Sequence, residues 1–490
     1  MISFYKKKVS DFNAWLFNFV VIAVSYYPLI NDRLYLVDDI TRSIKGYFGW
    51  LQLGRPLTEW LAMMLSTNSE RLADITPLPQ ILSIFALSYL TMLLLKNLFD
   101  EITVGGILIC LTVAVNPLVL GNMLFRFDSL SMILSMLMAV IAWDLLNKGK
   151  LLYVLILLIA SLSFYQPAIA VFPLLVMTKF IQNEKNEKQS INYIFKAFVV
   201  TMLSCAIYYI LIVKSTINET EKRADLSSGF INNIISGVNT SLSIALQSYG
   251  YIACIMIALS TIIFTVIYFK FLYDISKKKF HRKTITTLLL AISVPFVMLT
   301  CSAGVNLTLS NGYYPVRVLF PIAFIVFIML VIPALFSNHF KLASSYLSIV
   351  LILTSTSVIY ATASSLYHQQ RYDEYVLFSL SEKLSSLKSN KSAYIFNATD
   401  SSGASETSMR VFPILNHIKN NYYDMTLSQS LMSNGIKNIK FSGQDRIKSY
   451  SLEKMACQGQ MKLIYSMPQY SIFENDTSLL IYLGGNICNK

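Results

Sequence analysis

Two adjacent acids, Asp38 and Asp39, follow the first long apolar stretch of the chain, and Arg42 stands about one helical turn further on. The same polar loop also holds Arg55 and Glu59. A carboxylate can serve as a general base, and an arginine presents a planar fork that matches phosphate oxygens. Placed beside an apolar stretch, these residue types indicate chemistry on a lipid-linked phosphate rather than transport.

The acid pair has two interpretations. If a helix begins here, Arg42 lies three and four residues on and shares a face with both acids. Two adjacent carboxylates at an apolar boundary do not both ionise cheaply, so we expect the pKa of one to rise toward the working pH, as a general base for a sugar hydroxyl requires. The alternative is that the acids only favour the N-terminus of a helix. The sequence does not choose between Asp38 and Asp39 as the base.

A second group of candidate residues lies in later outer turns. Arg126 and Asp128 stand between the third and fourth apolar stretches, where such charges are expensive unless they are paired or functional. In the functional interpretation Arg126 contacts a donor phosphate and Asp128 lies near the acceptor. In the structural one Asp128 caps the next helix and Arg126 pairs with it. Tyr165 and Gln166, in a later turn, could bind a sugar or simply form the turn, and Arg317 ends the last outer loop.

The elements that position these residues are apolar helices. Of 490 residues 54% are apolar and 14% are charged, against roughly 25% charged in a soluble protein. We therefore predict a mainly α-helical, polytopic membrane protein with about eleven transmembrane helices, since each apolar stretch approaches the length that crosses a hydrocarbon core. The predicted spans are 12–30, 77–95, 103–122, 128–146, 150–165, 167–181, 194–213, 250–272, 284–303, 316–336 and 342–363.

The distribution of lysines predicts the orientation. Lysines gather in alternate connecting segments, which the positive-inside rule places in the cytoplasm together with the N-terminus. An odd number of spans then puts the C-terminus outside. The net charge of +13 is mostly this topology signal. Nucleic acid is excluded as a partner because the basic residues are scattered over short loops and form no stripe. The basic residues of these segments are Lys6, Lys7, Lys8, Lys96, Lys148, Lys150, Lys185, Lys188, Lys277, Lys278, Lys279, Arg282, Lys283 and Lys341.

Two domains are predicted. Residues 1–363 form the membrane body, whose first outer loop, 31–76, carries two amphipathic interfacial helices separated by Gly54 and Pro56. Residues 364–490 lose the apolar stretches and alternate helical patches (366–388, 409–420 and 425–435) with β-like runs (392–397, 436–441, 462–472 and 479–483). This pattern indicates a small α/β domain outside the membrane.

The positions of the cysteines indicate a disulfide, and those of the histidines argue against a histidine-based site. Cys457 and Cys488 are the only cysteines of the C-terminal domain, and an oxidising outer compartment predicts a disulfide between them. The four histidines are dispersed along the chain and none lies in the acidic loop. A zinc site or a histidine base is therefore unsupported.

Three motifs together resemble a known family. The sequences Leu-Val-Asp-Asp-Ile-Thr-Arg at 36–42, Gly-Arg-Pro-Leu at 54–57 and Phe-Arg-Phe-Asp-Ser at 125–129 are similar to those of serotype-converting glucosyltransferases encoded by temperate phages of enteric bacteria. Those proteins look like GT-C glycosyltransferases, whose catalytic acid lies in the first outer loop. The resemblance implies a GT-C-like fold in the bacterial inner membrane, with a periplasmic site and C-terminal domain. It also implies polyprenyl-phosphate-glucose as donor and lipid-linked O-antigen as acceptor.

Mapped onto this chain, the resemblance assigns the catalytic acid to Asp38 or Asp39. GT-C members often space two acids by one residue, whereas the acids here are adjacent. No metal ligands or cofactor are assigned, and a divalent metal stays an open alternative.

The sequence thus predicts an inverting transfer with an Asp general base. The donor phosphate would be held by Arg42, Arg55, Arg126 and Arg317, and the substrates contacted by Glu59, Asp128, Tyr165 and Gln166. A flippase or transporter is one alternative, although its ionisable residues should lie in mid-span. Asp144 and Lys196 stand near inner ends instead. An O-antigen polymerase is the other alternative, since it would also use outer arginines and a lipid-linked glycan.

Overall fold

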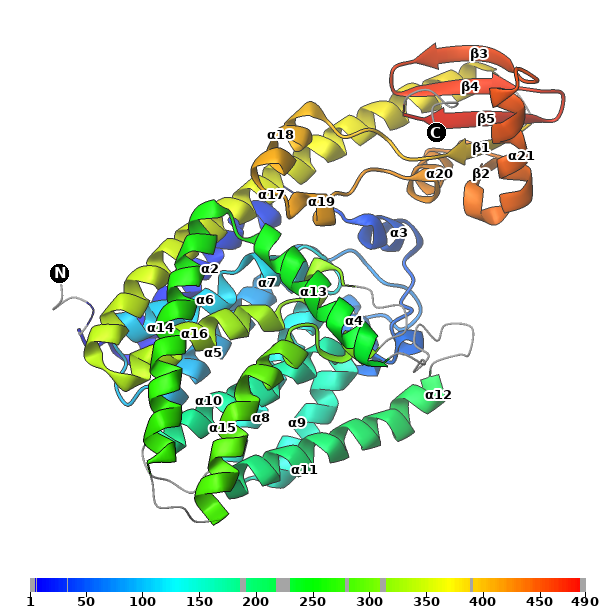
Figure 1. Cartoon of the computed structure of the whole chain (residues 1–490). Helices are drawn as coiled ribbons and strands as arrows, with labels where there is room; N and C mark the ends of the chain where they lie inside the picture. The colour runs from blue at the N-terminus through cyan, green and yellow to red at the C-terminus, as the bar shows by residue number, and fades with distance from the viewer. Residues whose placement is uncertain are drawn as a thin grey trace.

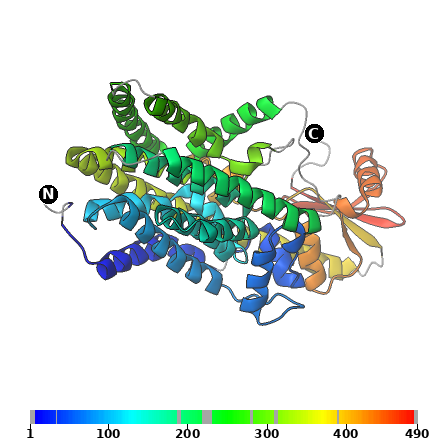
Figure 2. The same ribbon diagram turned by 90° about the horizontal axis from the view of Figure 1, so that it is seen from below.

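The computed structural model describes residue 5 and residues 7–32, 34–185, 191–216, 230–277, 282–308, 314–387 and 391–484. A body of packed helices carries a small sheet domain at one end (Figure 1). The long helix α17 (Asn338–Leu387) runs from the body into that domain. Figure 2, seen from below, shows the same division between helical body and sheet.

The helices of the body begin where the sequence supplies caps and end where it supplies breaks. Ser10 and Thr103 accept hydrogen bonds from backbone N–H groups of α2 and α6. Asn116 and Pro117 stop α6 and start α7, and the two helices are bent by 55°. The first body helices are α2 (Asp11–Asn31), α5 (Leu78–Leu98), α6 (Val104–Ala114), α7 (Pro117–Met123), α8 (Ser129–Asn147), α9 (Leu151–Phe164) and α10 (Val171–Lys185).

The second half of the body begins at residue 191. A π-helical turn, η3, interrupts the helix that begins with α11. The elements are α11 (Ile191–Tyr208), η3 (Tyr209–Val213), α12 (Lys214–Thr216), α13 (Phe230–Ser248), α14 (Tyr251–Ser276), α15 (Arg282–Cys301), η5 (Gly304–Thr308), η6 (Val316–Val318), α16 (Pro321–Phe336) and α17. Helix α13 lies between the predicted spans 194–213 and 250–272.

Seven helices of the described residues are long and apolar enough to cross a membrane, or eight if the bent pair α6–α7 is one span. They correspond to seven of the eleven predicted stretches. The other four form the bent pair and the shorter helices α9, α10 and α16. A membrane protein is thus supported, whereas the exact number of eleven spans stays a prediction.

The first outer loop has the two predicted helices, α3 (Val37–Lys45) and α4 (Pro56–Ser66), with a short turn, η1 (Leu51–Leu53), between them. Gly46 ends α3 and Gly54 ends η1, each with a positive φ that glycine adopts without strain. Pro56 occupies the first turn of α4, where its missing N–H costs nothing. These residues therefore mark where each of the short helices ends or begins.

The C-terminal domain is a five-stranded sheet in the order β2-β1-β5-β4-β3. Strand β1 is parallel to β2 and β5, and β4 is antiparallel to β5 and β3. Four predicted runs became β1 (Ser392–Phe396), β2 (Ile439–Phe441), the hairpin β3 (Lys462–Met467) with β4 (Tyr470–Glu474), and β5 (Ser478–Leu483). The helices are α18 (Gly403–Val411), α19 (Leu415–Ile418), α20 (Asp424–Ser433) and α21 (Arg446–Cys457).

Two details of this domain differ from the sequence prediction. The patch 409–420 is two helices, α18 and α19, because Pro413 cannot continue the first. Helix α17 crosses the predicted domain boundary at 363/364 without a break. Cys457 is exposed at the end of α21, but Cys488 lies outside the described residues, so the disulfide stays a prediction.

Candidate active site

Helix α3 gives the two adjacent acids different environments. Its N-cap position is Leu36, so both acids lie in the first turn. The Asp39 carboxylate is fully buried and accepts hydrogen bonds from the backbone N–H groups of Arg126 at 3.0 Å and Phe127 at 3.5 Å. Burial, opposed by these hydrogen bonds, raises the pKa of Asp39 to about 7. One acid of the pair thus has the expected raised pKa, but the main cause is burial rather than its neighbour.

Asp38 has the opposite environment. Its side chain is half exposed, and its carboxylate lies 3.5 Å from Nη1 of Arg317. The Arg317 guanidinium in turn stacks over the ring of Phe125 at 4.3 Å. An acid at the surface can reach a substrate, whereas a buried one cannot without a rearrangement. The two acids therefore differ in accessibility, a difference that the sequence did not reveal.

Arg42 forms its ion pair with Asp128 rather than with either acid of the pair. Its Nη1 lies 3.1 Å from Oδ2 of Asp128, and the side chains of both residues are 7% exposed. The indole N–H of Trp50 donates to the other carboxylate oxygen, and the Arg42 guanidinium stacks over the Trp50 ring at 4.2 Å. Arg42 supplies the ion pair that the structural interpretation had expected from Arg126. The Asp128 carboxylate faces these partners instead of capping α8.

Arg126 is also almost fully buried. Its guanidinium lies over the ring of Tyr35 at 4.8 Å, and Nη1 donates to the backbone carbonyl of Leu34 at 3.4 Å. Its backbone N–H binds Asp39, as described above. Arg126 and Asp39 together fasten the turn before α8 to the segment that leads into α3.

Arg55 belongs to a second cluster at the end of α9. Its Nε donates to Oε1 of Gln166 at 3.0 Å, and its guanidinium stacks over the ring of Tyr165 at 4.6 Å. The amide of Gln166 donates to the carbonyl of Leu53 and to the hydroxyl of Tyr208. Tyr208 donates to the carbonyl of Gly54 at 2.7 Å. These bonds hold the turn at 53–55 and orient the guanidinium.

The two clusters are connected. The Tyr165 hydroxyl donates to the backbone carbonyl of Arg317 at 3.3 Å. Gly121 lets the same stretch approach closely, since a Cβ there would lie 2.7 Å from the Arg317 nitrogen. Glu59 accepts the N–H of Leu51 at 2.8 Å and so stabilises η1. Residues predicted from five separate parts of the sequence thus meet at one end of the helical body.

Some residues of this site were not predicted. Trp50 and Tyr35 belong to the acidic loop. Their aromatic rings stand near arginines in the sequence, which was the available signal that they could stack on a guanidinium. Tyr208 lies inside an apolar stretch, where no feature of the sequence distinguishes it. Among the residues that the structure describes, no group of three or more His, Cys, Asp or Glu side chains is placed to hold a metal ion.

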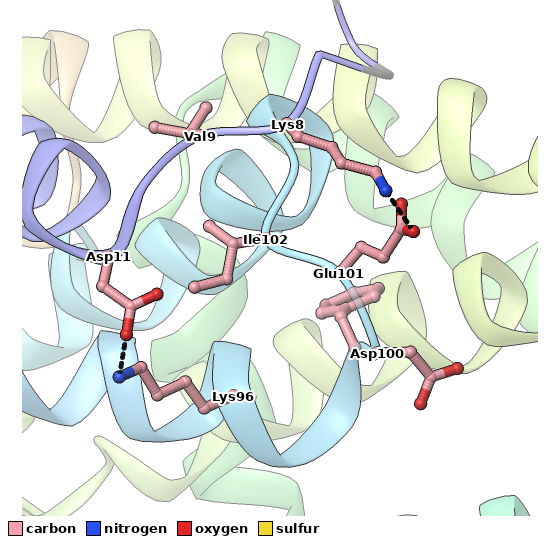
Figure 3. A pocket seen from close by; sticks show the side chains of 8 residues that line it. Lys8, Val9, Asp11, Lys96, Asp100, Glu101 and Ile102 are labelled. Carbon is pink, nitrogen blue, oxygen red and sulfur yellow. Dashed lines mark hydrogen bonds and ion pairs between the residues drawn. The ribbon is translucent and has the colours of Figure 1, made fainter.

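A pocket elsewhere on the molecule is separate from this site. Figure 3 shows it beside the first turn of α2, where Lys8 pairs with Glu101 and Lys96 pairs with Asp11. Helix α2 has 21 residues, which corresponds to roughly 30 Å, and α3 follows its other end. The pocket therefore lies at the end of the helical body away from the acid pair.

Two comparisons with known proteins identify the family of the chain. A family model described as glucosyl transferase GtrII matches residues 26–372, a range that includes every candidate residue from Asp38 to Arg317. An uncharacterized 55.3 kDa protein in the gtrB 5′ region of Salmonella phage P22 is 28% identical over 233 residues, which are 45% of this chain and 48% of that protein. The match spans about half the length of this curated relative. The family model covers most of the chain, and the protein belongs to the GtrII glucosyltransferase family.

Proposed function

We propose that the protein transfers glucose from a polyprenyl-phosphate donor to lipid-linked O-antigen at the periplasmic face of the bacterial inner membrane. Family membership supports a glycosyltransferase acting in O-antigen modification. The observation that supports this donor and acceptor most is the position of Asp38, an accessible carboxylate beside Arg317 in the first turn of α3. A base and an anion-binding group are thereby close together at the end of a bundle of apolar helices.

Asp38 is assigned as the general base and Asp39 as a positioning residue. In the proposed reaction Asp38 takes the proton of an acceptor hydroxyl, whose oxygen forms a bond to the anomeric carbon. The bond from that carbon to the phosphate oxygen breaks, and polyprenyl phosphate leaves with the electron pair. Attack from the face opposite the leaving group inverts the anomeric centre. Asp39 holds the turn at 126–127 through its two backbone hydrogen bonds.

Arg317 and Arg55 are assigned to the donor phosphate. The Arg317–Asp38 pair is partly exposed, so its two charges can exchange partners at small cost. A donor phosphate that takes Arg317 would leave Asp38 free to accept a proton. Positive groups aimed at the phosphate stabilise the charge that develops as it leaves. Arg42 and Arg126 make buried contacts within the protein. We therefore assign them to stabilising the loop instead of binding the donor phosphate.

Arg55→Lys should lower the turnover number about a hundredfold, because an ammonium cannot both bond Gln166 and stack on Tyr165 as the guanidinium does. The rate of glucose transfer in membranes measures this effect. Arg71→Lys is the matched control, since Arg71 is an exposed arginine of the same loop. Equal rates for the two variants would remove Arg55 from the proposed site.

The proposed orientation has a separate test. An alkaline phosphatase fused to the C-terminus should be active and a fused cytosolic fluorescent reporter should be dark, because the lysine distribution predicts a cytoplasmic N-terminus and a periplasmic C-terminal domain. Fusions that report the reverse pattern would show that the acid pair faces the cytoplasm.

The function itself is tested by expressing the chain in a host with a defined O-antigen and determining the polysaccharide structure. A new glucosyl side branch is the expected result. Altered chain length without a new branch would support a polymerase. An unchanged polysaccharide, with the donor moved across the membrane, would support a flippase.

A further inference from the structure

Helix α3 belongs to two packing units at once. Asp39 and Arg42 face the helical body, as their contacts with Arg126 and Asp128 show. Ile40, which follows Asp39 in the chain, is buried in the hydrophobic cluster of the C-terminal domain. That cluster includes Val376 and Leu377 of α17, Tyr422, Leu427 and Leu431 around α20, and residues of the sheet.

A polar contact fixes the same junction. The side-chain amide of Asn420 donates to the backbone carbonyl of Tyr35, just before α3, at 2.7 Å. Helix α20 packs against α3, and the two helices lie next to one another in Figures 1 and 2. The C-terminal domain is therefore built onto the segment that carries the acid pair.

The junction places Tyr423 of the C-terminal domain next to the first turn of α3, because Asn420 bonds Tyr35 and Tyr422 shares the buried cluster with Ile40. Tyr423 is the N-cap residue of α20 and is partly exposed. Burial raises the pKa of Tyr423, and the Asp38 carboxylate and Tyr47 add to the effect through their proximity. Tyr47 follows the end of α3, is 41% exposed, and lies 5.5 Å below the Arg42 guanidinium. Tyr423 begins α20 and Tyr47 follows the end of α3, so two tyrosines with accessible rings lie on the two helices that pack at this junction.

We propose that Tyr423, with Tyr47, forms the subsite for the acceptor sugar beside Asp38. The proposal rests on the proposed function. An aromatic ring offers an apolar face to the C–H face of a sugar, and a tyrosine hydroxyl can bond a sugar hydroxyl. A sugar between these rings would present its hydroxyl to Asp38. The C-terminal domain then supplies a specificity residue directly.

The alternative is that Tyr423 only packs the junction. Its backbone is already bridged to Ala398, and its position before α20 would suit a structural role. The two roles differ in what they change. A packing role affects the amount of folded protein and every activity equally, whereas an acceptor subsite affects only steps that involve the acceptor.

The test compares acceptor-dependent and acceptor-independent reactions of the full chain in membranes. Initial rates of glucose transfer are measured against acceptor polysaccharide concentration, and hydrolysis of the polyprenyl-phosphate-glucose donor is measured without acceptor. Tyr423→Ala and Tyr423→Leu should raise the KM for acceptor roughly tenfold and leave donor hydrolysis unchanged. Tyr423→Trp should keep a KM close to that of the parent protein.

Tyr375→Ala is the matched control, because Tyr375 is a 56% exposed tyrosine on the distal part of α17. Leucine keeps apolar volume without a ring, so a junction that only needs packing would be rescued by Tyr423→Leu. An acceptor KM unchanged in Tyr423→Ala, or restored in Tyr423→Leu, would overturn the subsite. Parallel loss of donor hydrolysis would also overturn it. A parent protein that moves no glucose would instead refute the proposed function.

Discussion

Asp38→Asn is expected to abolish glucose transfer while the protein still inserts in the membrane. The amide cannot take the proton of the acceptor hydroxyl, and a general base contributes about 10²- to 10⁴-fold to such a step. The side chain is half exposed and its pair with Arg317 is weak, so the folded structure should be little affected. Transfer measured per amount of folded protein in membranes tests the expectation.

Comparison with Asp39→Asn distinguishes the catalytic role assigned to Asp38 from the positioning role assigned to Asp39. It keeps one oxygen for the N–H of Arg126 but loses the second acceptor, which costs about 1–3 kcal/mol of stability. We therefore expect less folded protein with measurable turnover per folded molecule. Loss of turnover in Asp39→Asn with normal turnover in Asp38→Asn would exchange the two roles.

The pH dependence of stability separates the acids further. The raised pKa means that folded Asp39 keeps a proton up to about pH 7, whereas the unfolded chain releases it near 3.8. The folded state thus binds more protons in this window, and the free energy of unfolding contributed by Asp39 falls as the pH rises from about 4 to about 7. Asp39→Asn should lack this slope, and Asp38→Asn should retain it.

The largest expected effect on stability comes from Asp128→Asn. The substitution leaves Arg42 as a buried cation without its carboxylate, which costs about 3–5 kcal/mol. We expect a large loss of folded protein, measured as thermal unfolding in detergent. Glu101→Gln is the matched control, because it breaks an exposed pair with Lys8 and should cost about 1 kcal/mol or less.

The double variant Arg42→Gln with Asp128→Asn should recover part of that stability. It removes both charges, so neither is left buried alone, and the new amide can still accept from Trp50. A double variant no more stable than Asp128→Asn would mean that the guanidinium stacking on Trp50, rather than the ion pair, holds the loop.

Much of the fold could be predicted because its signals are local. Apolar stretches located the body helices, and Gly54 with Pro56 located the break between two loop helices. The run at 462–472 was one predicted strand, whereas it is a hairpin that turns at Pro468 and Gln469. Pro468 was the available sign of the turn, because proline lacks the N–H that a strand ladder uses.

The site was predictable by residue type but not by role. Charged residues in outer loops of an apolar chain are few, so Asp38, Arg55 and Arg317 could be selected. Which charges are buried depends on contacts between distant segments, such as Arg42 with Asp128, 86 residues apart. Ile40 inside the core of the C-terminal domain is another contact of this kind.

The 50 residues of α17 form one uninterrupted helix, about 75 Å long, while a hydrocarbon core is about 30 Å thick. As a rigid connection, the helix sets both the distance of the sheet from the helical body and the rotation of the sheet about the helix axis. One residue added to its distal half would lift the sheet about 1.5 Å and rotate it by about 100°. Ile40 would then no longer reach the hydrophobic cluster of the C-terminal domain. Unlike a loop, this connection can change length only by steps close to whole helical turns.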